Sequence, residues 1–277
     1  MSLSPLARWL LRIFTWLALA FLYVPLIVVA ILSFNTSTSL AWPPDGFTTD
    51  WWSRAWEIDG PREAFWTSVK IAAVATGIAL VLGTLAAFAL QRYKFFGRQA
   101  VSFLLILPIA LPGIVTAVAL QNTFSRHITL GPLDVQIGFG FHSVVIAHAT
   151  FCVVVAYNNV VARLRRTSPN LLEASADLGA DGFQTFRHVT FPLVRSALLA
   201  GGILAFALSF DEIVVTTFTA GAGIETLPQW ILNNLTRPNN VPLVNVVATV
   251  TMIISIPLAW LAQRLSDGGP GSVTTAP

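Results

Sequence analysis

Charged residues are scarce in this sequence. They make up 10% of its 277 residues, whereas hydrophobic residues make up 55% and the mean hydropathy is +0.72. A soluble domain has about 25% charged residues, so this chain has too few to cover a surface that faces water. The composition excludes an ordinary soluble protein and predicts an integral membrane protein whose outer surface faces lipid.

Cysteine and lysine are nearly absent as well. The single cysteine, Cys152, lies in an apolar run and permits neither an intrachain disulfide nor a cysteine-based metal site. The two lysines, Lys70 and Lys94, do not follow a glycine-rich loop, so the chain has no P-loop for ATP. No His-Glu-x-x-His or Gly-x-Ser-x-Gly motif occurs. We therefore expect no catalytic residue, metal site or bound cofactor, and a membrane-embedded enzyme is disfavoured.

Six apolar segments are long enough to cross a bilayer, which requires about 20 residues of helix. Their approximate bounds are 13–34, 65–90, 100–120, 141–161, 196–218 and 243–261. The first exceeds the apolar stretch of a signal peptide, which has about 7–15 residues, so we expect it to be retained. The sequence predicts an all-α protein with one transmembrane domain, residues 1–265, and a disordered tail, residues 266–277.

The basic residues are concentrated in alternate connections between these segments. Eleven of the sixteen lie near the N-terminus, between the second and third segments, in residues 162–195, or near the C-terminus. Positive charge marks the cytoplasmic side of a membrane protein, so both termini are expected in the cytoplasm. Membrane topology and contact with lipid headgroups thereby account for the net charge of +3, and no binding of nucleic acid is expected.

The connection at residues 162–194 is too polar to cross the membrane, yet it has signals of ordered structure. Ser168, followed by a proline, is suited to begin a short helix. Gly179 stands where a left-handed residue would end that helix. Asp181 is suited to cap a second short helix, and Pro192 is expected to restart the chain toward the fifth membrane segment. The pattern predicts a helix-turn-helix on the inner face of the membrane, which would suit the docking of a partner.

The same connection resembles the EAA loop of ABC importer permeases. That family pattern is Glu-Ala-Ala, three residues, Gly, nine residues and Ile-x-Leu-Pro, and here the spacing is intact. The matching residues are Glu173, Ala174, Ser175, Gly179, Val189, Phe191 and Pro192. The resemblance implies a permease fold of the type I ABC importer kind, with a coupling helix that sits in a cleft of a separate ATPase subunit. A merely structural cytoplasmic hairpin is the alternative.

Further segments resemble permeases for spermidine and putrescine. They are Leu-Ser-Phe-Asp-Glu at 208–212, Thr-Leu-Pro at 226–228, the Pro-x-x-Asn-x-x-Ala-Thr run at 242–249, and His148-x-Thr-Phe. The resemblance implies a polyamine importer of the bacterial inner membrane. Its other parts would be a second permease subunit, a dimer of ATP-binding subunits that binds the ATP, and a periplasmic or extracellular solute-binding protein. The departures from the pattern, at 153–156 and at Val246, leave an ABC permease for another small solute as the alternative.

Two adjacent carboxylates, Asp211 and Glu212, fall within the fifth predicted segment, in the outer half of the membrane. A carboxylate at the bilayer centre costs about 2.5–3.5 kcal/mol and suggests a functional site. In a continuous helix Glu212 would share a polar face with Ser209, Thr216 and Thr219. We therefore expect a translocation path that includes Ser209, Asp211, Glu212 and Thr216, with Glu212 rather than Asp211 in contact with the solute. Bonding between helices, or to a second permease, is the alternative.

Three other positions within the predicted segments bear on mechanism. Pro108 and Pro112 are expected to bend the third segment, either as part of a gate or as an ordinary bend. His148 is expected to be a hydrogen-bonded structural residue rather than a proton relay. An ion-coupled secondary transporter, with His148 and the two carboxylates as relays, is the competing class of function, but the loop at 173–192 would have no role in it.

Overall fold

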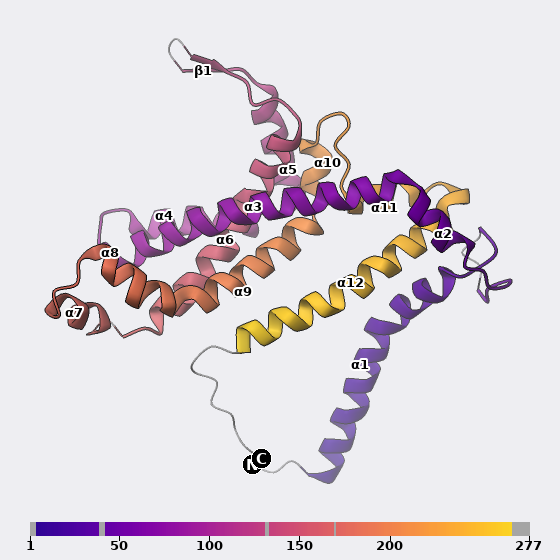
Figure 1. Ribbon diagram of the computed structural model, residues 1–277, viewed down its shortest axis with the longest axis horizontal. Coiled ribbons are helices and arrows are strands. Elements are labelled where there is room, and N and C mark those ends of the chain that lie inside the picture. The colour runs from indigo at the N-terminus through magenta and orange to yellow at the C-terminus, as the bar shows by residue number, and fades with distance from the viewer. Residues whose placement is uncertain (1–3, 39–41, 131–132, 169, 268–277) are drawn as a thin grey trace. The chain divides into compact units, whose positions relative to one another are not determined.

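The computed structural model describes residues 4–38, 42–130, 133–168 and 170–267 (Figure 1). Within those ranges the regular elements are helices apart from a two-stranded antiparallel hairpin, β1 (Ile128–Leu130) and β2 (Leu133–Val135). The predicted all-α class is confirmed. Most of the predicted tail, residues 268–277, lies outside the described residues. The chain divides into two compact units, residues 1–62 with 230–257, and residues 63–229 with 258–277.

The first unit contains α1 (Pro5–Leu32), α2 (Asp50–Glu57), most of α11 (Leu227–Leu235), a 3₁₀ turn, η2 (Pro238–Asn240), and the first part of α12 (Val241–Asp267). Only 6% of the most apolar stretch of α1 is buried. An apolar helix with so little covered surface is suited to face lipid or another subunit. The loop after α1 is organised by buried Asn35, whose side-chain oxygen accepts the backbone N–H of Asp45 and whose carbonyl accepts the indole N–H of Trp51.

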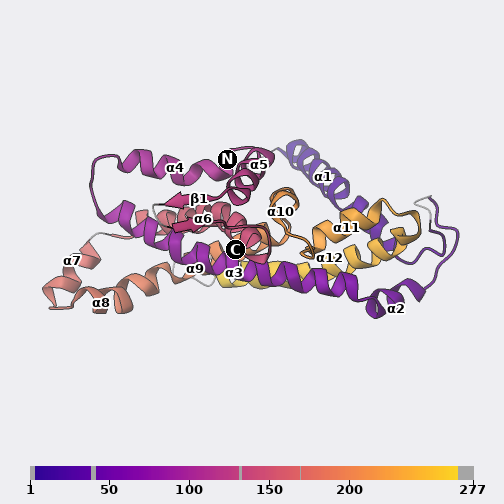
Figure 2. The ribbon, with the colours of Figure 1, turned by 90° about the horizontal axis from the view of Figure 1, so that it is seen from above.

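In the second unit α3 (Asp59–Arg92) and α9 (Phe191–Phe210) both pack against α6 (Phe141–Arg165) (Figure 2). The most apolar stretch of α6 is 67% buried, against 39% for α3, so α6 is the central helix. Glycine residues allow α3 and α9 to lie close to α6. A Cβ atom at Gly83 of α3 would lie 2.8 Å from the carbonyl oxygen of Val153, and one at Gly201 of α9 would lie 3.2 Å from Asn159 Cβ. Small residues commonly let membrane helices approach in this way.

Four described helices have the length and composition to cross a membrane: α1, α3, α6 and the continuous helix Gly182–Phe210. A fifth span follows if α4 (Arg98–Ala110) and α5 (Gly113–Ser125) count as one bent pair. The sixth predicted segment corresponds to a shorter apolar helix, Val241–Pro257, at the start of α12.

The expected bend in the third predicted segment is a complete break. The chain turns by 104° between α4 and α5. Leu111 is extended there, with ψ of 148°, because the residue before a proline is disfavoured in the helical region. Pro112 therefore separates the helices, whereas Pro108 remains inside α4.

Candidate functional site

The fifth predicted segment is interrupted at its two carboxylates. Helix α9 ends at Phe210, and α10 (Val214–Thr219) begins after three non-helical residues. The prediction of one continuous helix over 196–218 is therefore wrong. The carboxylate of Glu212 accepts the backbone N–H of Val215 at 2.9 Å. A side chain that satisfies a free N–H of a new helix competes with continuation of the old one, and this is the local reason for the break.

His148 of α6 connects the two sides of the break. Its Nδ1 lies 2.8 Å from Ser209 Oγ in the last turn of α9, and its Nε2 lies 2.9 Å from Thr216 Oγ1 in α10. All three side chains are buried. The Thr216 hydroxyl donates its proton to the carbonyl of Glu212, so it accepts from Nε2–H, and Ser209 donates to Nδ1. A neutral imidazole with its proton on Nε2 thus satisfies every partner, as a structural histidine would.

The break changes the environment of the two carboxylates. Glu212 is half-buried and is engaged with Val215, whereas Asp211 is exposed. Within the described part of the chain, the carboxylate of Asp211 has no hydrogen-bond or ion-pair partner. The polar helical face that was predicted to join Glu212 with Ser209 and Thr216 is therefore not formed, because the helix is interrupted between Phe210 and Val214. The side chains of Ser209 and Thr216 instead each hydrogen-bond to the imidazole of His148.

An aromatic cluster adjoins the break. The ring of Phe210 lies 5.9 Å from that of Phe65 in α3 and 6.1 Å from that of Phe206, measured between centroids. This cluster could not be recognised from the sequence, because Phe65 is far from Phe206 and Phe210 along the chain and aromatic residues are frequent throughout. A carboxylate attracts a cation and the face of an aromatic ring can bind one, so Asp211 and its sequence neighbour Phe210 offer two groups of this chemistry. Among the described residues no cluster of three or more His, Cys, Asp or Glu could hold a metal.

The helix-turn-helix predicted for residues 162–194 is present. Helix α7 (Asn170–Asp177) is followed by Gly179 with φ of +79°, the left-handed conformation that the pattern indicated. Asp181 and Gln184 exchange hydrogen bonds in a capping box that begins α8 (Gly182–Thr185). The hydroxyls of Ser175 and Thr185, 2.9 Å apart, tie the two short helices together.

The far end of this helix-turn-helix differs from the prediction. Pro192 does not restart the chain, because α8 continues through a π-helical turn, η1 (Phe186–Thr190), directly into α9. The N–H of Phe191 reaches back to the carbonyl of Phe186, five residues earlier. Pro192, which has no N–H to donate, directly follows this π-helical turn as the second residue of α9. The side chain of Arg163 donates to the carbonyl of Leu193 at 2.8 Å and joins the end of α6 to this turn.

The turn between α7 and α8 exposes apolar as well as charged side chains. Leu178 is 89% exposed and Phe183 is 69% exposed. Glu173 and Ala174 are also exposed, whereas Ser175 is buried. Of the other motif residues, Val189 is half-buried, and Phe191 and Pro192 are exposed. Large apolar side chains on an otherwise polar projecting loop indicate a docking surface.

Comparison with known proteins places this geometry in a family. The pattern of the family described as "Binding-protein-dependent transport system inner membrane component" matches residues 79–268. The spermidine/putrescine transport system permease protein PotC of Haemophilus influenzae is 35% identical over 94% of this chain and 98% of its own. PotC of Escherichia coli K12 is 34% identical over 89% and 90%, and the putrescine permease PotI of that strain is 32% identical over 85% and 83%.

Solved structures with the same fold include a bacterial alginate ABC transporter. Its chain superimposes with a TM-score of 0.72 over 95% of this chain and 96% of its own, at 15% identity, in the complex with an alginate-bound periplasmic protein. A second structure, of an ABC transporter that imports alginate, gives a TM-score of 0.65 over 95% and 99%, at 16% identity. At such identities the likeness concerns the fold alone, and it confirms the importer-permease fold that the motifs suggested.

Proposed function

This chain belongs to the family of binding-protein-dependent transport system inner membrane components, the multi-pass permeases of ABC importers, and we propose that the solute it carries is a polyamine. It is a transport subunit rather than an enzyme, and its importer includes an ATPase and a solute-binding protein. The polyamine assignment rests on 32–35% identity to three polyamine permeases, over at least 83% of each relative.

The chemistry of the break in the fifth segment supports a cationic solute. A polyamine loses much of its hydration in a membrane passage, and a nearby carboxylate offsets part of that loss. Asp211 offers an exposed carboxylate, and Phe210 adds a ring face for an ammonium or methylene group. We assign solute contact to Asp211. Ser209, Glu212 and Thr216, the other path candidates, shape the break through their hydrogen bonds.

The connection between α6 and α9 is proposed as the coupling element. Here α7 and α8 insert into a cleft of the ATPase and transmit its closure to α9, because α8, η1 and α9 are one continuous helix. Glu173, Ala174 and Gly179 line the docking side and its turn, with Ser175 inside. Val189, Phe191 and Pro192 form the passage into the membrane helix. Exposed Leu178 and Phe183 support an apolar partner surface.

The proposed assembly has four kinds of subunit. This chain pairs with a second, different permease, and the pair binds a dimer of ATPase subunits, which hold the ATP. A periplasmic solute-binding protein delivers the polyamine from the other side. The large uncovered apolar surface of α1 supports contact with lipid or with the second permease.

Both termini and residues 162–194 are proposed to be cytoplasmic. Cysteines introduced at Thr38 and Thr236 should react with an impermeant maleimide in intact cells, whereas one at Asn170 should react only after lysis. The native Cys152 is buried and gives little background. Labelling of the Asn170 variant alone in intact cells would show that the topology is the reverse of the one proposed.

Transport by the purified complex tests the proposed identity of the solute. Proteoliposomes that contain this chain, the second permease and the ATPase, with ATP on the ATPase side and the binding protein on the other, should take up labelled spermidine or putrescine. Unlabelled polyamine should compete, and omission of ATP should abolish uptake. ATP-driven uptake of a neutral or anionic solute, with none of either polyamine, would instead support the alternative of an ABC permease for another small solute.

A further inference from the structure

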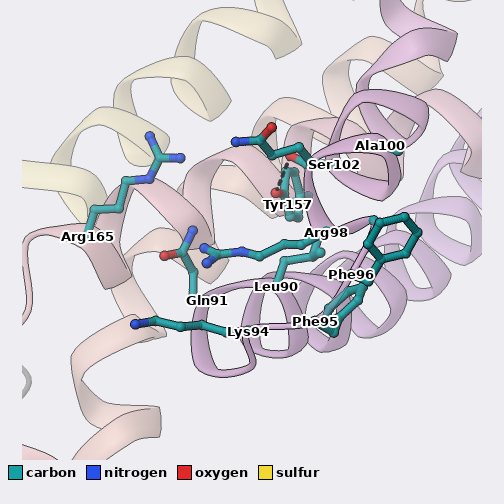
Figure 3. Close-up of a pocket in the computed structure, with 12 residues that line it drawn as sticks. Leu90, Gln91, Lys94, Phe95, Phe96, Arg98, Ala100, Ser102, Tyr157 and Arg165 are labelled. Carbon is teal, nitrogen blue, oxygen red and sulfur yellow. Dashed lines mark hydrogen bonds between the residues drawn. The ribbon is translucent and has the colours of Figure 1, made fainter.

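A cavity of about 730 Å³ lies where α3 ends, α4 begins and α6 ends (Figure 3). Its lining includes three cationic side chains, Lys94, Arg98 and Arg165, and no acidic residue. Figure 3 shows Gln91, Lys94 and Arg98 directed into the same space, with Arg165 on the α6 side of it. In the ranges that the structure describes, none of the three cations has an ion-pair partner. The cavity therefore concentrates uncompensated positive charge.

A hydrogen bond at the base of the cavity joins two of the helices that line it. Tyr157 of α6 is buried at its base, and its hydroxyl lies 3.1 Å from the Ser102 hydroxyl of α4. This bond joins α4 to α6 beneath the cations. Hydroxyl and amide groups beside three cations form the donor set that a phosphate group needs. A polycationic solute would be repelled here, so the cavity is no part of the proposed solute path.

The surroundings favour a lipid as the source of that phosphate. Phe95 and Phe96, in the connection between α3 and α4, also line the cavity, and both rings are exposed. In Figure 3 they lie on the side away from the side-chain ends of Lys94 and Arg165. Aromatic rings at the end of membrane helices are suited to the level of headgroups and upper acyl chains. Basic pockets between membrane helices at this level bind anionic headgroups.

We propose that this cavity binds the phosphate headgroup of an anionic phospholipid and that the bound lipid braces the start of α4 against the end of α6. Arg165 is the last residue of α6, and the chain continues from it to α7. The lipid therefore lies at the start of the connection that contains α7 and α8. The inference uses the proposed function only in placing this end of the helices at the anionic leaflet, and it does not depend on the solute.

Lipid retention by the assembled complex tests the site. The complex is reconstituted in nanodiscs of phosphatidylglycerol and phosphatidylcholine in equal parts, extracted, and examined by native mass spectrometry for bound lipid. The wild-type complex should retain phosphatidylglycerol preferentially. Lys94→Gln with Arg98→Gln should weaken that retention about 30-fold, since each basic group near a headgroup contributes about fivefold.

Two further variants separate the site from general effects of charge and folding. Arg8→Gln with Arg12→Gln removes the same charge from exposed positions on α1, at the same proposed membrane side, and should leave retention unchanged. Lys94→Arg with Arg98→Lys keeps the charge and should keep retention. An equal loss in the α1 variant, or undiminished preference in the Lys94 and Arg98 double glutamine variant, would overturn the proposal.

A final measurement distinguishes a lipid headgroup from free phosphate as the ligand of the cavity. In detergent, phosphatidylglycerol should raise the thermal stability of the wild-type complex, and inorganic phosphate at the same concentration should not. Stabilisation by inorganic phosphate alone would make this a site for a free anion and would overturn the lipid assignment. Retained phosphatidylglycerol preference without any polyamine uptake would reject the proposed solute and leave the lipid site standing.

Discussion

The imidazole of His148 lies 2.8 Å from the hydroxyl of Ser209, and this hydrogen bond attaches the end of α9 to the central helix immediately before the chain breaks. The other ring nitrogen holds Thr216 on the far side of the break at 2.9 Å. One buried side chain thus sets the separation and direction of two helices, and with them the position of the carboxylates between them.

Removal of the His148 ring should therefore disturb the break. His148→Ala leaves the buried Ser209 hydroxyl without this partner, which costs about 1–3 kcal/mol for a buried polar group left unsatisfied, and it leaves the Thr216 hydroxyl with only its bond to the Glu212 carbonyl. We expect a lower temperature of thermal inactivation and reduced uptake by the reconstituted complex. His142→Ala is the matched control, because His142 is exposed and its ring bonds the nearby carbonyl of Ile137 rather than a buried side chain. Equal stability of the two variants would show that His148 does not hold the break.

The two carboxylates should differ in function. Asp211→Asn removes the exposed charge and should reduce polyamine uptake at least about tenfold, the effect of 1.4 kcal/mol, while the complex assembles normally. In Glu212→Gln the amide oxygen can still accept the N–H of Val215, so a smaller decrease is expected, from the lost charge near the start of α10. Uptake is measured in vesicles at matched amounts of complex. Full uptake by the double variant would exclude both residues from the path.

The left-handed turn at Gly179 should be required for coupling. A side chain there is strained by about 1–2 kcal/mol because φ is +79°, so Gly179→Ala should shift α7 against α8 and weaken binding of the ATPase. Gly182→Ala is the matched control, since no atom lies within 4 Å of its added Cβ and its φ is ordinary. Co-purification of the ATPase with each variant provides the measurement. The coupling role would be contradicted if both variants retained the ATPase equally.

Close packing of α3 on α6 should make Gly83 intolerant of any side chain. The Cβ of Gly83→Ala would lie 2.8 Å from the Val153 carbonyl oxygen and 2.9 Å from the Tyr157 backbone nitrogen. Overpacking of this kind costs about 1–3 kcal/mol, and we expect a lower yield of assembled complex and earlier thermal aggregation. Gly77→Ala in the same helix meets no atom within 4 Å and should be neutral. A neutral Gly83→Ala would imply that α3 can move away from α6.

Local features were predictable where neighbouring residues alone determine them. The turn at Gly179 and the cap at Asp181 depend on contacts within four residues, and both are present as expected. The break in the fifth segment was not predictable from hydropathy. Its interrupting residues are flanked by apolar runs on both sides, and no glycine or proline marks it. The signal that could have found it was a carboxylate three residues before an N–H that it could cap.

By itself the sequence determined that this is a membrane protein. It has too few charged residues to cover a surface that faces water, and its apolar segments are long enough to cross a bilayer. It also determined the family, through the spacing from Glu173 to Pro192. Only the tertiary structure decided which carboxylate is exposed, that His148 holds the break, and that Lys94, Arg98 and Arg165 share one cavity. Those relationships join helices 55 or more residues apart, as between Ser102 and Tyr157, and packing alone brings such residues together.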